Sequence, residues 1–141
     1  MIESIIIESE SEMMAFGKQI GLSANPGDIF GLIGDLGAGK THFTKGFVLG
    51  NHCDKPVTSP TFSLIHEYEG GSTPIFHFDL YRLESASELL EIGWEDYLEM
   101  GGICIVEWAD KFTELMPEKI KWLKIELLDD QKRLIKELIG P

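Results

Sequence analysis

Residues 34–41 of the chain read Gly34-Asp-Leu-Gly-Ala-Gly-Lys-Thr41, which fits the GxxxxGK[ST] pattern of phosphate-binding P-loops. The apolar run at residues 28–33 precedes this stretch and predicts a buried strand. Residues 39–49 follow it and predict a helix that Gly50 closes. A glycine-rich turn between a strand and a helix is the setting in which the motif binds phosphate. The alternative, a tight turn with an exposed lysine, fits this context less well.

Each type of residue in the motif has a physical role. Gly34, Gly37 and Gly39 allow backbone turns that side chains would block, so that N–H groups point inward as an anion site. The helix that begins near Gly39 adds the positive end of its dipole. Lys40 is expected to bridge the β- and γ-phosphates, and the Thr41 hydroxyl to coordinate Mg²⁺. The nucleotide-binding residues expected here are Gly34, Asp35, Leu36, Gly37, Ala38, Gly39, Lys40, Thr41 and His42.

A P-loop also needs a carboxylate at the end of a neighbouring strand. Residues 75–79 and 103–107 are apolar strand candidates that end in Asp79 and Glu107. Because open α/β sheets bind ligands at the carboxyl ends of their strands, both acids are expected at the metal and in catalysis. His77 alternates with Asp79 on one strand face, so it is expected to orient that carboxylate or to be a core histidine.

A hydroxyl-bearing segment, Thr58-Ser-Pro-Thr-Phe62, lies between the P-loop helix and the Asp79 strand. P-loop switch proteins place at this position a loop that senses the γ-phosphate and Mg²⁺. Thr61 is therefore a candidate catalytic residue. An ordinary proline-containing turn is the alternative.

Hydrophobic periodicity predicts the other elements. Ser9 and Glu12 form a capping box that opens a helix, with Gly21 at its end. Residues 85–92 are expected to be helical. Strands are expected at 4–7, 62–68, 75–80, 102–106 and 120–127, and 133–139 is either the second strand of a terminal hairpin or a helix. A single domain spanning 1–141 is expected, in the α/β class: a P-loop NTPase-like three-layer sandwich with a mixed central sheet and antiparallel additions.

The charge of the chain bears on its partners. It has 24 acidic and 12 basic side chains and a net charge of −12. Residues 1–118 carry 20 acidic and 6 basic side chains, whereas residues 119–141 carry 4 acidic and 6 basic ones. An acidic surface repels a phosphate backbone, so strong direct binding of nucleic acid is not expected.

Cysteine usage and hydropathy exclude further classes. Cys53 and Cys104 form no metal-binding pattern, and Cys104 is expected to be a core thiol. The early apolar run at residues 5–7 is too short for a membrane span and lacks the basic flank of a signal peptide. A cytoplasmic protein without a membrane association is expected.

Five stretches together resemble the TsaE family, the bacterial ATPases of tRNA threonylcarbamoyladenosine (t6A) biosynthesis. They are residues 26–41 with the P-loop, Val57-Thr-Ser-Pro-Thr-Phe62, His77-Phe-Asp-Leu-Tyr-Arg-Leu83, Glu91-Ile-Gly-Trp-Glu-Asp-Tyr97 and Ile105-Val-Glu-Trp108. They follow the family's order through most of residues 26–110. The termini match the family less clearly, and His42 stands where many members carry a hydroxyl residue.

The resemblance implies a Mg²⁺-dependent ATPase that is slow alone and acts with the threonylcarbamoyl-transferase subunit and that subunit's inactive paralogue. The resulting complex would modify adenosine 37 of tRNA, and this chain would contact tRNA only through the other two proteins. Carried over by position, Lys40 and Thr41 hold phosphate and Mg²⁺, and Thr61 belongs to the switch-like loop. Glu107 sits at the metal with Asp79 as its partner, and Trp108 lies beside the site. Adenine contacts are expected from the termini, with Ser11 and Arg133 as candidates.

Other functions stay open at this point. A P-loop small-molecule kinase normally clamps its ligands with several arginines, whereas this chain has only Arg82 and Arg133. A GTPase is disfavoured because no Asn-Lys-x-Asp segment occurs. A non-hydrolysing, ATP-gated binding module is the remaining alternative. An acidic stripe at helical spacing, either a solvated face or a docking surface, is expected if one helix continues through Gly93: Glu84, Glu88, Glu91 and Glu95.

Overall fold

The computed structural model describes residues 3–35, 37–53 and 64–140. The strands are β1 (Glu3–Ile7), β2 (Ile29–Ile33), β3 (Ile65–Tyr68), β4 (Ile75–Asp79), β5 (Ile103–Glu107), β6 (Lys121–Leu127) and β7 (Arg133–Leu138). The helices are α1 (Glu10–Ser23), α2 (Lys40–Gly50), α3 (Ala86–Glu91), α4 (Trp94–Glu99) and the 3-10 helix η1 (Ala109–Leu115).

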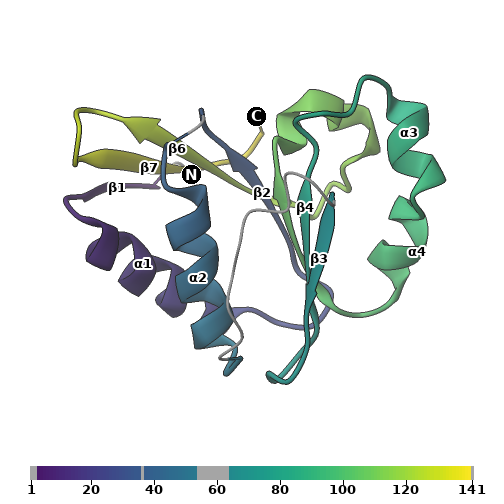
Figure 1. Ribbon diagram of the computed structural model, residues 1–141, viewed down its shortest axis with the longest axis horizontal. Coiled ribbons are helices and arrows are strands. Elements are labelled where there is room, and N and C mark those ends of the chain that lie inside the picture. The colour runs from purple at the N-terminus through teal and green to yellow at the C-terminus, as the bar shows by residue number, and fades with distance from the viewer. Residues whose placement is uncertain (1–2, 36, 54–63, 141) are drawn as a thin grey trace.

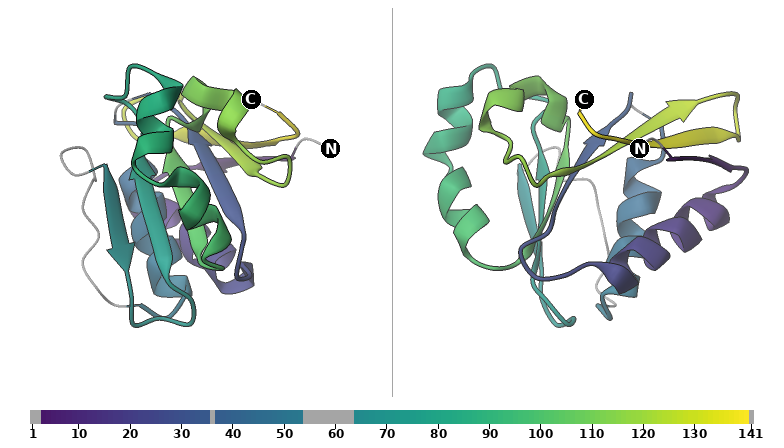
Figure 2. Two further views of the ribbon diagram at one scale, coloured as in Figure 1. Left: turned by 90° about the vertical axis from the view of Figure 1, so that its right-hand side faces the viewer. Right: turned by 180° about the vertical axis from the view of Figure 1, so that it is seen from behind.

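The strands form one mixed sheet in the order β1-β7-β6-β2-β5-β4-β3. The four central strands β6, β2, β5 and β4 run parallel to one another. β7 and β1 extend one side of the sheet antiparallel, and β3 does so on the other side. Helices α1 and α2 cover one face and α3 and α4 the other (Figures 1 and 2). The α/β sandwich with a mixed sheet and antiparallel additions is therefore confirmed.

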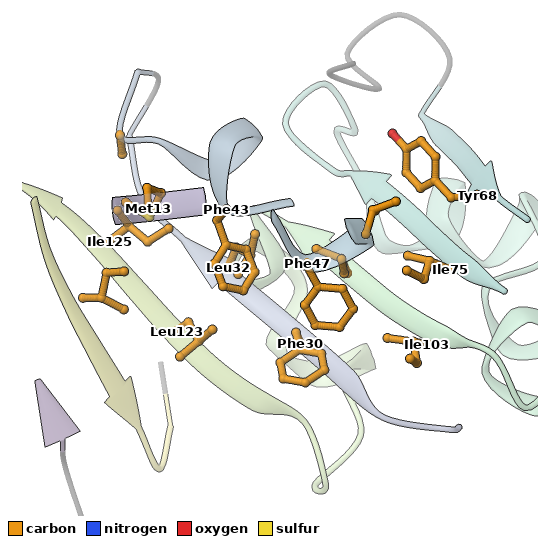
Figure 3. Close-up of a cluster of buried hydrophobic side chains, with 14 of the residues drawn as sticks. Met13, Phe30, Leu32, Phe43, Phe47, Tyr68, Ile75, Ile103, Leu123 and Ile125 are labelled. Atoms are coloured by element: carbon orange, nitrogen blue, oxygen red, sulfur yellow. The ribbon is translucent and has the colours of Figure 1, made fainter. Parts of the chain in front are cut away.

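The alternation of side chains along each strand divides the core into two clusters. Phe30 and Leu32 of β2 face α1 and α2, whereas Ile29 belongs to the cluster under α3 and α4. Figure 3 shows the first cluster, in which Phe43 and Phe47 of α2 lie over β2. The rings of Phe30 and Phe47 meet edge to face with centroids 5.1 Å apart. Because side chains alternate with a period of two, the acids that end β4 and β5 lie on the face of the sheet that α1 and α2 cover.

Glycines bring α1 and α2 into close contact. A Cβ atom on Gly17 would lie 2.1 Å from the carbonyl oxygen of Phe43, and one on Gly46 would lie 1.9 Å from that of Met14. Gly21 and Gly50 belong to the same interface, and each is the site of a similar clash. The expectation that Gly21 ends its helix is therefore wrong, because α1 runs to Ser23 and Gly21 serves helix packing instead. The expectation for Gly50 is confirmed, since α2 ends at this residue, which also lies in the interface.

The acidic stripe is not built as expected. Gly93 adopts a left-handed conformation with φ of 93° and separates α3 from α4. Glu84 precedes α3, Glu88 and Glu91 lie on it, and Glu95 lies on α4. The helical spacing of these acids therefore does not place them on one face of one helix.

The structure refines several other expected elements. The Ser9 cap is confirmed, since its hydroxyl accepts a hydrogen bond from the Glu12 backbone N–H at 3.1 Å, whereas the Glu12 carboxylate accepts from the backbone N–H of Glu8, one residue before the N-cap, at 2.6 Å. The terminal segment is a hairpin of β6 and β7, so the helical alternative is wrong for β7. In the described residues β3 begins at Ile65, and residues 62 and 63 of the expected strand lie outside them. Sequence reasoning missed α4 and η1, which are short.

Among the described residues, no helix has both the length and the apolar character needed to cross a membrane.

Candidate functional site

The turn between β2 and α2 has the backbone geometry expected of a P-loop. Gly37 and Gly39 have φ angles of 80° and 108°, which side-chain-bearing residues rarely adopt. Gly34 serves a different purpose, because a Cβ atom there would lie 2.8 Å from the carbonyl oxygen of Ile125 on β6. The first glycine of the motif thus allows the loop after β2 to pass close to β6. Leu36 lies outside the described residues.

The N-terminus of α2 is suited to an anion. Its N-cap, Gly39, has no side chain to accept a hydrogen bond from the first-turn N–H groups. The N-terminus of α1, by contrast, is capped by the Ser9 hydroxyl. No acidic residue occupies the first turn of α2. Its amides and dipole are therefore directed toward the cavity that follows, where phosphate oxygens are matching partners.

Lys40 begins α2 and is only 5% exposed. Its Nζ donates a hydrogen bond to the Gly34 carbonyl oxygen at 2.7 Å, lies 4.0 Å from Glu107 Oε1, and sits 4.3 Å from the ring centroid of Trp108. Burial lowers the pKa of the ammonium group below its ordinary value of 10.5, and the negative charges of Glu107 and Asp79 oppose that shift. The P-loop motif therefore places the Lys40 ammonium group at the loop, and the fold surrounds it with the carboxylates of Glu107 and Asp79.

Asp79 and Glu107 end two neighbouring parallel strands. They are directly paired in the register of β4 and β5, and both are nearly buried, at 6% and 4% exposed. Asp79 Oδ1 accepts a hydrogen bond from the Tyr81 backbone N–H at 3.0 Å. Since β5 also pairs with β2, the two carboxylates lie at the sheet edge from which the P-loop emerges. This is the arrangement that the two apolar strand patterns predict.

His77 contacts a different carboxylate from the one expected. Its Nε2 lies 2.6 Å from Glu107 Oε2, and its Nδ1 lies 3.3 Å from the Tyr68 hydroxyl. The expectation that His77 orients Asp79 is not what these contacts show, because β5 brings Glu107 across the sheet to the imidazole. Sequence reasoning missed Tyr68, although its alternation with His66 on a strand antiparallel to β4 is a usable signal.

Trp108 follows Glu107 and adopts a left-handed backbone conformation with φ of 61°. Its ring lies beside that of Tyr81 with centroids 4.9 Å apart, in addition to covering Lys40. Lys111 donates a hydrogen bond to the Tyr81 carbonyl oxygen at 2.6 Å. The Trp108 indole therefore forms one wall of the site. Tyr81, which follows β4, and Lys111, which follows β5, keep it in place.

These features meet in a cavity of about 630 Å³. It brings together the start of α1, the P-loop, the ends of β4 and β5, and the β6–β7 turn. Its lining includes most of the residues expected from the sequence: Ser11, Gly37, Gly39, Lys40, Thr41, His42, Asp79, Glu107 and Arg133. Gly34, Asp35 and Ala38 belong to the loop but do not line the cavity, and Thr61 lies outside the described residues.

Arg133 and His42 each have a protein partner at this cavity. The Arg133 Nε donates to the Ala38 carbonyl oxygen at 3.0 Å, and its Nη2 donates to that of Gly37 at 3.3 Å. The guanidinium group thus fastens the β6–β7 hairpin to the P-loop. His42 Nε2 lies 3.3 Å from Glu10 Oε2, which links α2 to the first turn of α1. Ser11 lines the cavity from that same turn.

The donors at this site fit Mg²⁺. Within the described residues, no group of three or more His, Cys, Asp or Glu side chains is arranged to hold a metal ion by itself. Mg²⁺ is usually held by one or two carboxylates together with substrate phosphates and waters, rather than by a complete protein cage. The Thr41 hydroxyl and the Asp79 and Glu107 carboxylates are hard oxygen donors in one cavity, and they meet that requirement.

Comparison with known proteins agrees with this description. The model of the family "Threonylcarbamoyl adenosine biosynthesis protein TsaE" matches residues 7–135. A tRNA threonylcarbamoyladenosine biosynthesis protein TsaE from Bacillus subtilis is 43% identical over 124 residues, which are 88% of this chain and 77% of the relative. The protein of that name from Haemophilus influenzae is 37% identical over 139 residues, covering 95% and 87%.

Among solved structures, the crystal structure of Bacillus subtilis YdiB superposes with a TM-score of 0.83 at 35% sequence identity. The match covers 97% of this chain and 84% of that one. A family model spanning most of the chain, similar relatives and a shared fold lead to one conclusion. The chain belongs to the TsaE family.

Proposed function

We propose that the protein is a Mg²⁺-dependent ATPase that is slow on its own and supports the threonylcarbamoylation of adenosine 37 in tRNA. One observation carries the ATPase part of this proposal. A P-loop with a buried lysine and two strand-end carboxylates share a single cavity of about 630 Å³. Membership in the TsaE family carries the part that concerns tRNA modification.

The proposed binding mode assigns a task to each group. The α2 N-terminus and Lys40 bind the phosphates, and Thr41, Asp79 and Glu107 hold the metal ion. When bound there, Mg²⁺ neutralises charge that develops on the transferred phosphoryl group. Glu107 also orients the attacking water, because its Oε1 lies 4.0 Å from the Lys40 ammonium group, at the phosphate-binding end of the cavity. Thr61 is proposed to act from residues 58–62, which respond to the nucleotide.

The proposed partners are the threonylcarbamoyl-transferase subunit and its inactive paralogue, in the cytoplasm. ATP binding favours docking on these two proteins, and hydrolysis resets the complex after a modification cycle. The net charge of −12 supports a role in which the partners, rather than this chain, contact tRNA. A negatively charged protein still binds ATP because the P-loop amides, Lys40 and the metal supply local positive charge.

The test is phosphate release by the wild type and by Glu107→Ala, each with and without the two partner proteins. We expect the partners to stimulate the wild type and the variant to lose about 100-fold or more in turnover, as removal of a water-activating group does. Glu118→Ala, at an exposed acid that does not line the cavity, is the matched control and should behave as wild type.

Two results would contradict the proposal. One is wild-type turnover in Glu107→Ala, and the other is a lack of stimulation by the partners. ATP consumption that depends on an added small-molecule acceptor would instead support the kinase alternative. ATP binding and partner docking without any hydrolysis would support the ATP-gated module.

A further inference from the structure

We infer that His77 is a positioning residue for Glu107, and that Tyr68 holds the imidazole in the tautomer that donates a hydrogen bond to this carboxylate. The inference rests on the proposed function, because it concerns how the carboxylate that serves Mg²⁺ and water is kept in place. His77 lies in the middle of β4 and is completely buried. It does not line the cavity, so it acts through Glu107 rather than on a ligand.

The two oxygens of Glu107 are held differently. Oε2 lies 2.6 Å from His77 Nε2, at the short end of the distances found for hydrogen bonds to a charged acceptor. Oε1 lies 4.0 Å from Lys40 Nζ, on the side of the P-loop. One oxygen is therefore anchored inside the sheet, and the other is presented to the cavity. A carboxylate with a single fixed oxygen has a defined plane in which its second oxygen meets a metal ion or a water molecule.

The partners of His77 define its tautomer. A carboxylate oxygen only accepts hydrogen bonds, so the hydrogen of the imidazole must be on Nε2. In the neutral ring Nδ1 is then an acceptor, and the Tyr68 hydroxyl at 3.3 Å is placed to donate to it. Tyr68 is itself nearly buried, and its hydroxyl also lies 3.4 Å from His66 Nδ1. This chain of contacts runs from β3 through β4 to β5.

A structural role alone does not account for the choice of partner. Most carboxylates and histidines that ligate metals or face a reaction are oriented by a second group, and removing that group costs about 10- to 100-fold in metal affinity or activity. His77 bonds to the same carboxylate that contacts the P-loop lysine, through the other of its two oxygens. The arrangement is that of an outer-shell group which fixes a ligand.

The experiment compares His77→Leu, which removes the donor, with His77→Gln, whose amide nitrogen takes the approximate place of Nε2. Two quantities are measured. One is kcat and KM for ATP, and the other is the gain in affinity for a non-hydrolysable ATP analogue when Mg²⁺ is added, by calorimetry. Ile75→Val is the matched control, because it lightens a fully buried residue on the same strand face without touching the hydrogen bond.

For His77→Leu we expect kcat to fall about 10- to 100-fold and KM for ATP in the presence of Mg²⁺ to rise, because KM follows the affinity for the nucleotide when hydrolysis is slow. The Mg²⁺-dependent gain in affinity should be lost, whereas affinity without Mg²⁺ should stay that of the wild type. His77→Gln should recover most of both quantities. Tyr68→Phe, which removes one hydroxyl and keeps the ring, should shift both in the same direction by a smaller factor, and it carries the test if His77→Leu does not fold.

The inference and the proposed function fail in different ways. Wild-type kcat and Mg²⁺ gain in folded His77→Leu would overturn the inference and leave the ATPase in place. Equal losses in Ile75→Val and His77→Gln would also overturn it, because they would indicate a general effect of core stability. A wild-type protein that binds no Mg²⁺-ATP, or that hydrolyses none, would overturn the proposed function regardless of the His77 variants.

Discussion

Seven polar or charged side chains are buried among the described residues, and four of them belong to the site or its support: Lys40, His77, Asp79 and Glu107. Burial of such groups costs free energy unless each has a partner. Within the described part of the chain, every buried side-chain nitrogen or oxygen has a hydrogen-bond partner. Individual residues at the ends of β4 and β5 are therefore held by contacts that a surface loop does not provide.

Burial affects the ionisation of Cys104, which lies on the face of β5 opposite Glu107. This effect predicts how stability depends on pH. Its thiol is 1% exposed, and burial raises its pKa from 9.0 to about 12. Between these values the unfolded chain loses a proton that the native protein retains. Stability is thus complete below pH 9 and falls by about 1.4 kcal/mol per pH unit above it, until the native thiol also ionises.

Urea unfolding at pH 8 and pH 10.5 checks this prediction by comparing the wild type with Cys104→Ala. The variant lacks the thiol, so its stability should fall less between the two pH values, while all other titrating groups are common to both proteins. An identical fall in both proteins would contradict the role of Cys104.

At the level of secondary-structure elements, the packing of α1 on α2 sets the position of the P-loop helix. Four glycines, Gly17, Gly21, Gly46 and Gly50, remove the side chains that would separate the two backbones. The aromatic rings of Phe43 and Phe47 then fill the space between α2 and the sheet (Figure 3). The helix that carries Lys40 is consequently fixed between α1 and β2.

Gly46→Ala tests this packing. Alanine favours a helix over glycine by about 1 kcal/mol, but here its Cβ atom would lie 1.9 Å from the Met14 carbonyl oxygen. Overpacking of this kind costs about 1–3 kcal/mol or more, so we expect a net loss of stability in chemical denaturation. Gln19→Ala, on the exposed side of α1, is the control and should change stability by less than about 0.5 kcal/mol. A stabilised Gly46→Ala would contradict the close packing.

The same elements indicate where sequence patterns succeed. Strands such as β2 and β5 are short apolar runs, and their hydrophobic pattern predicts them directly. Helix ends are less predictable, because glycine is typical of both helix termination and close packing. The pattern predicts that Gly21 ends a helix, but Gly21 serves close packing, whereas Gly93 does break a helix through its positive φ. A local pattern does not distinguish these uses, because the neighbour that decides between them lies far away in the sequence.

At the scale of the whole molecule, the strand order assembles the cavity. β5 lies between β2 and β4, so Glu107 comes next to a P-loop that is about seventy residues earlier in the sequence. The β6–β7 hairpin lies on the other side of β2 and brings Arg133 to the same loop. The C-terminal segment, which is mildly basic, thus reaches the cavity.

Arg133→Ala and Arg133→Lys distinguish two roles for this side chain. If it fastens the hairpin to the P-loop, neither variant restores both carbonyl contacts, and each should lose about 1–2 kcal/mol of stability together with nucleotide affinity. If its main task is to attract nucleotide phosphates, Arg133→Lys should keep most of the affinity. Chemical denaturation and calorimetric titration with ATP measure the two effects separately.

The sequence by itself determined the P-loop turn, the Ser9 cap and the acids that end β4 and β5. These features depend on backbone conformations and alternation within a few residues, so local chemistry is sufficient. Only the tertiary structure decided that His77 contacts Glu107, that Tyr68 supports it and that Arg133 bonds to the P-loop carbonyls. Those pairings join residues on different strands, and strand order and register, which no local pattern encodes, determine which side chains meet.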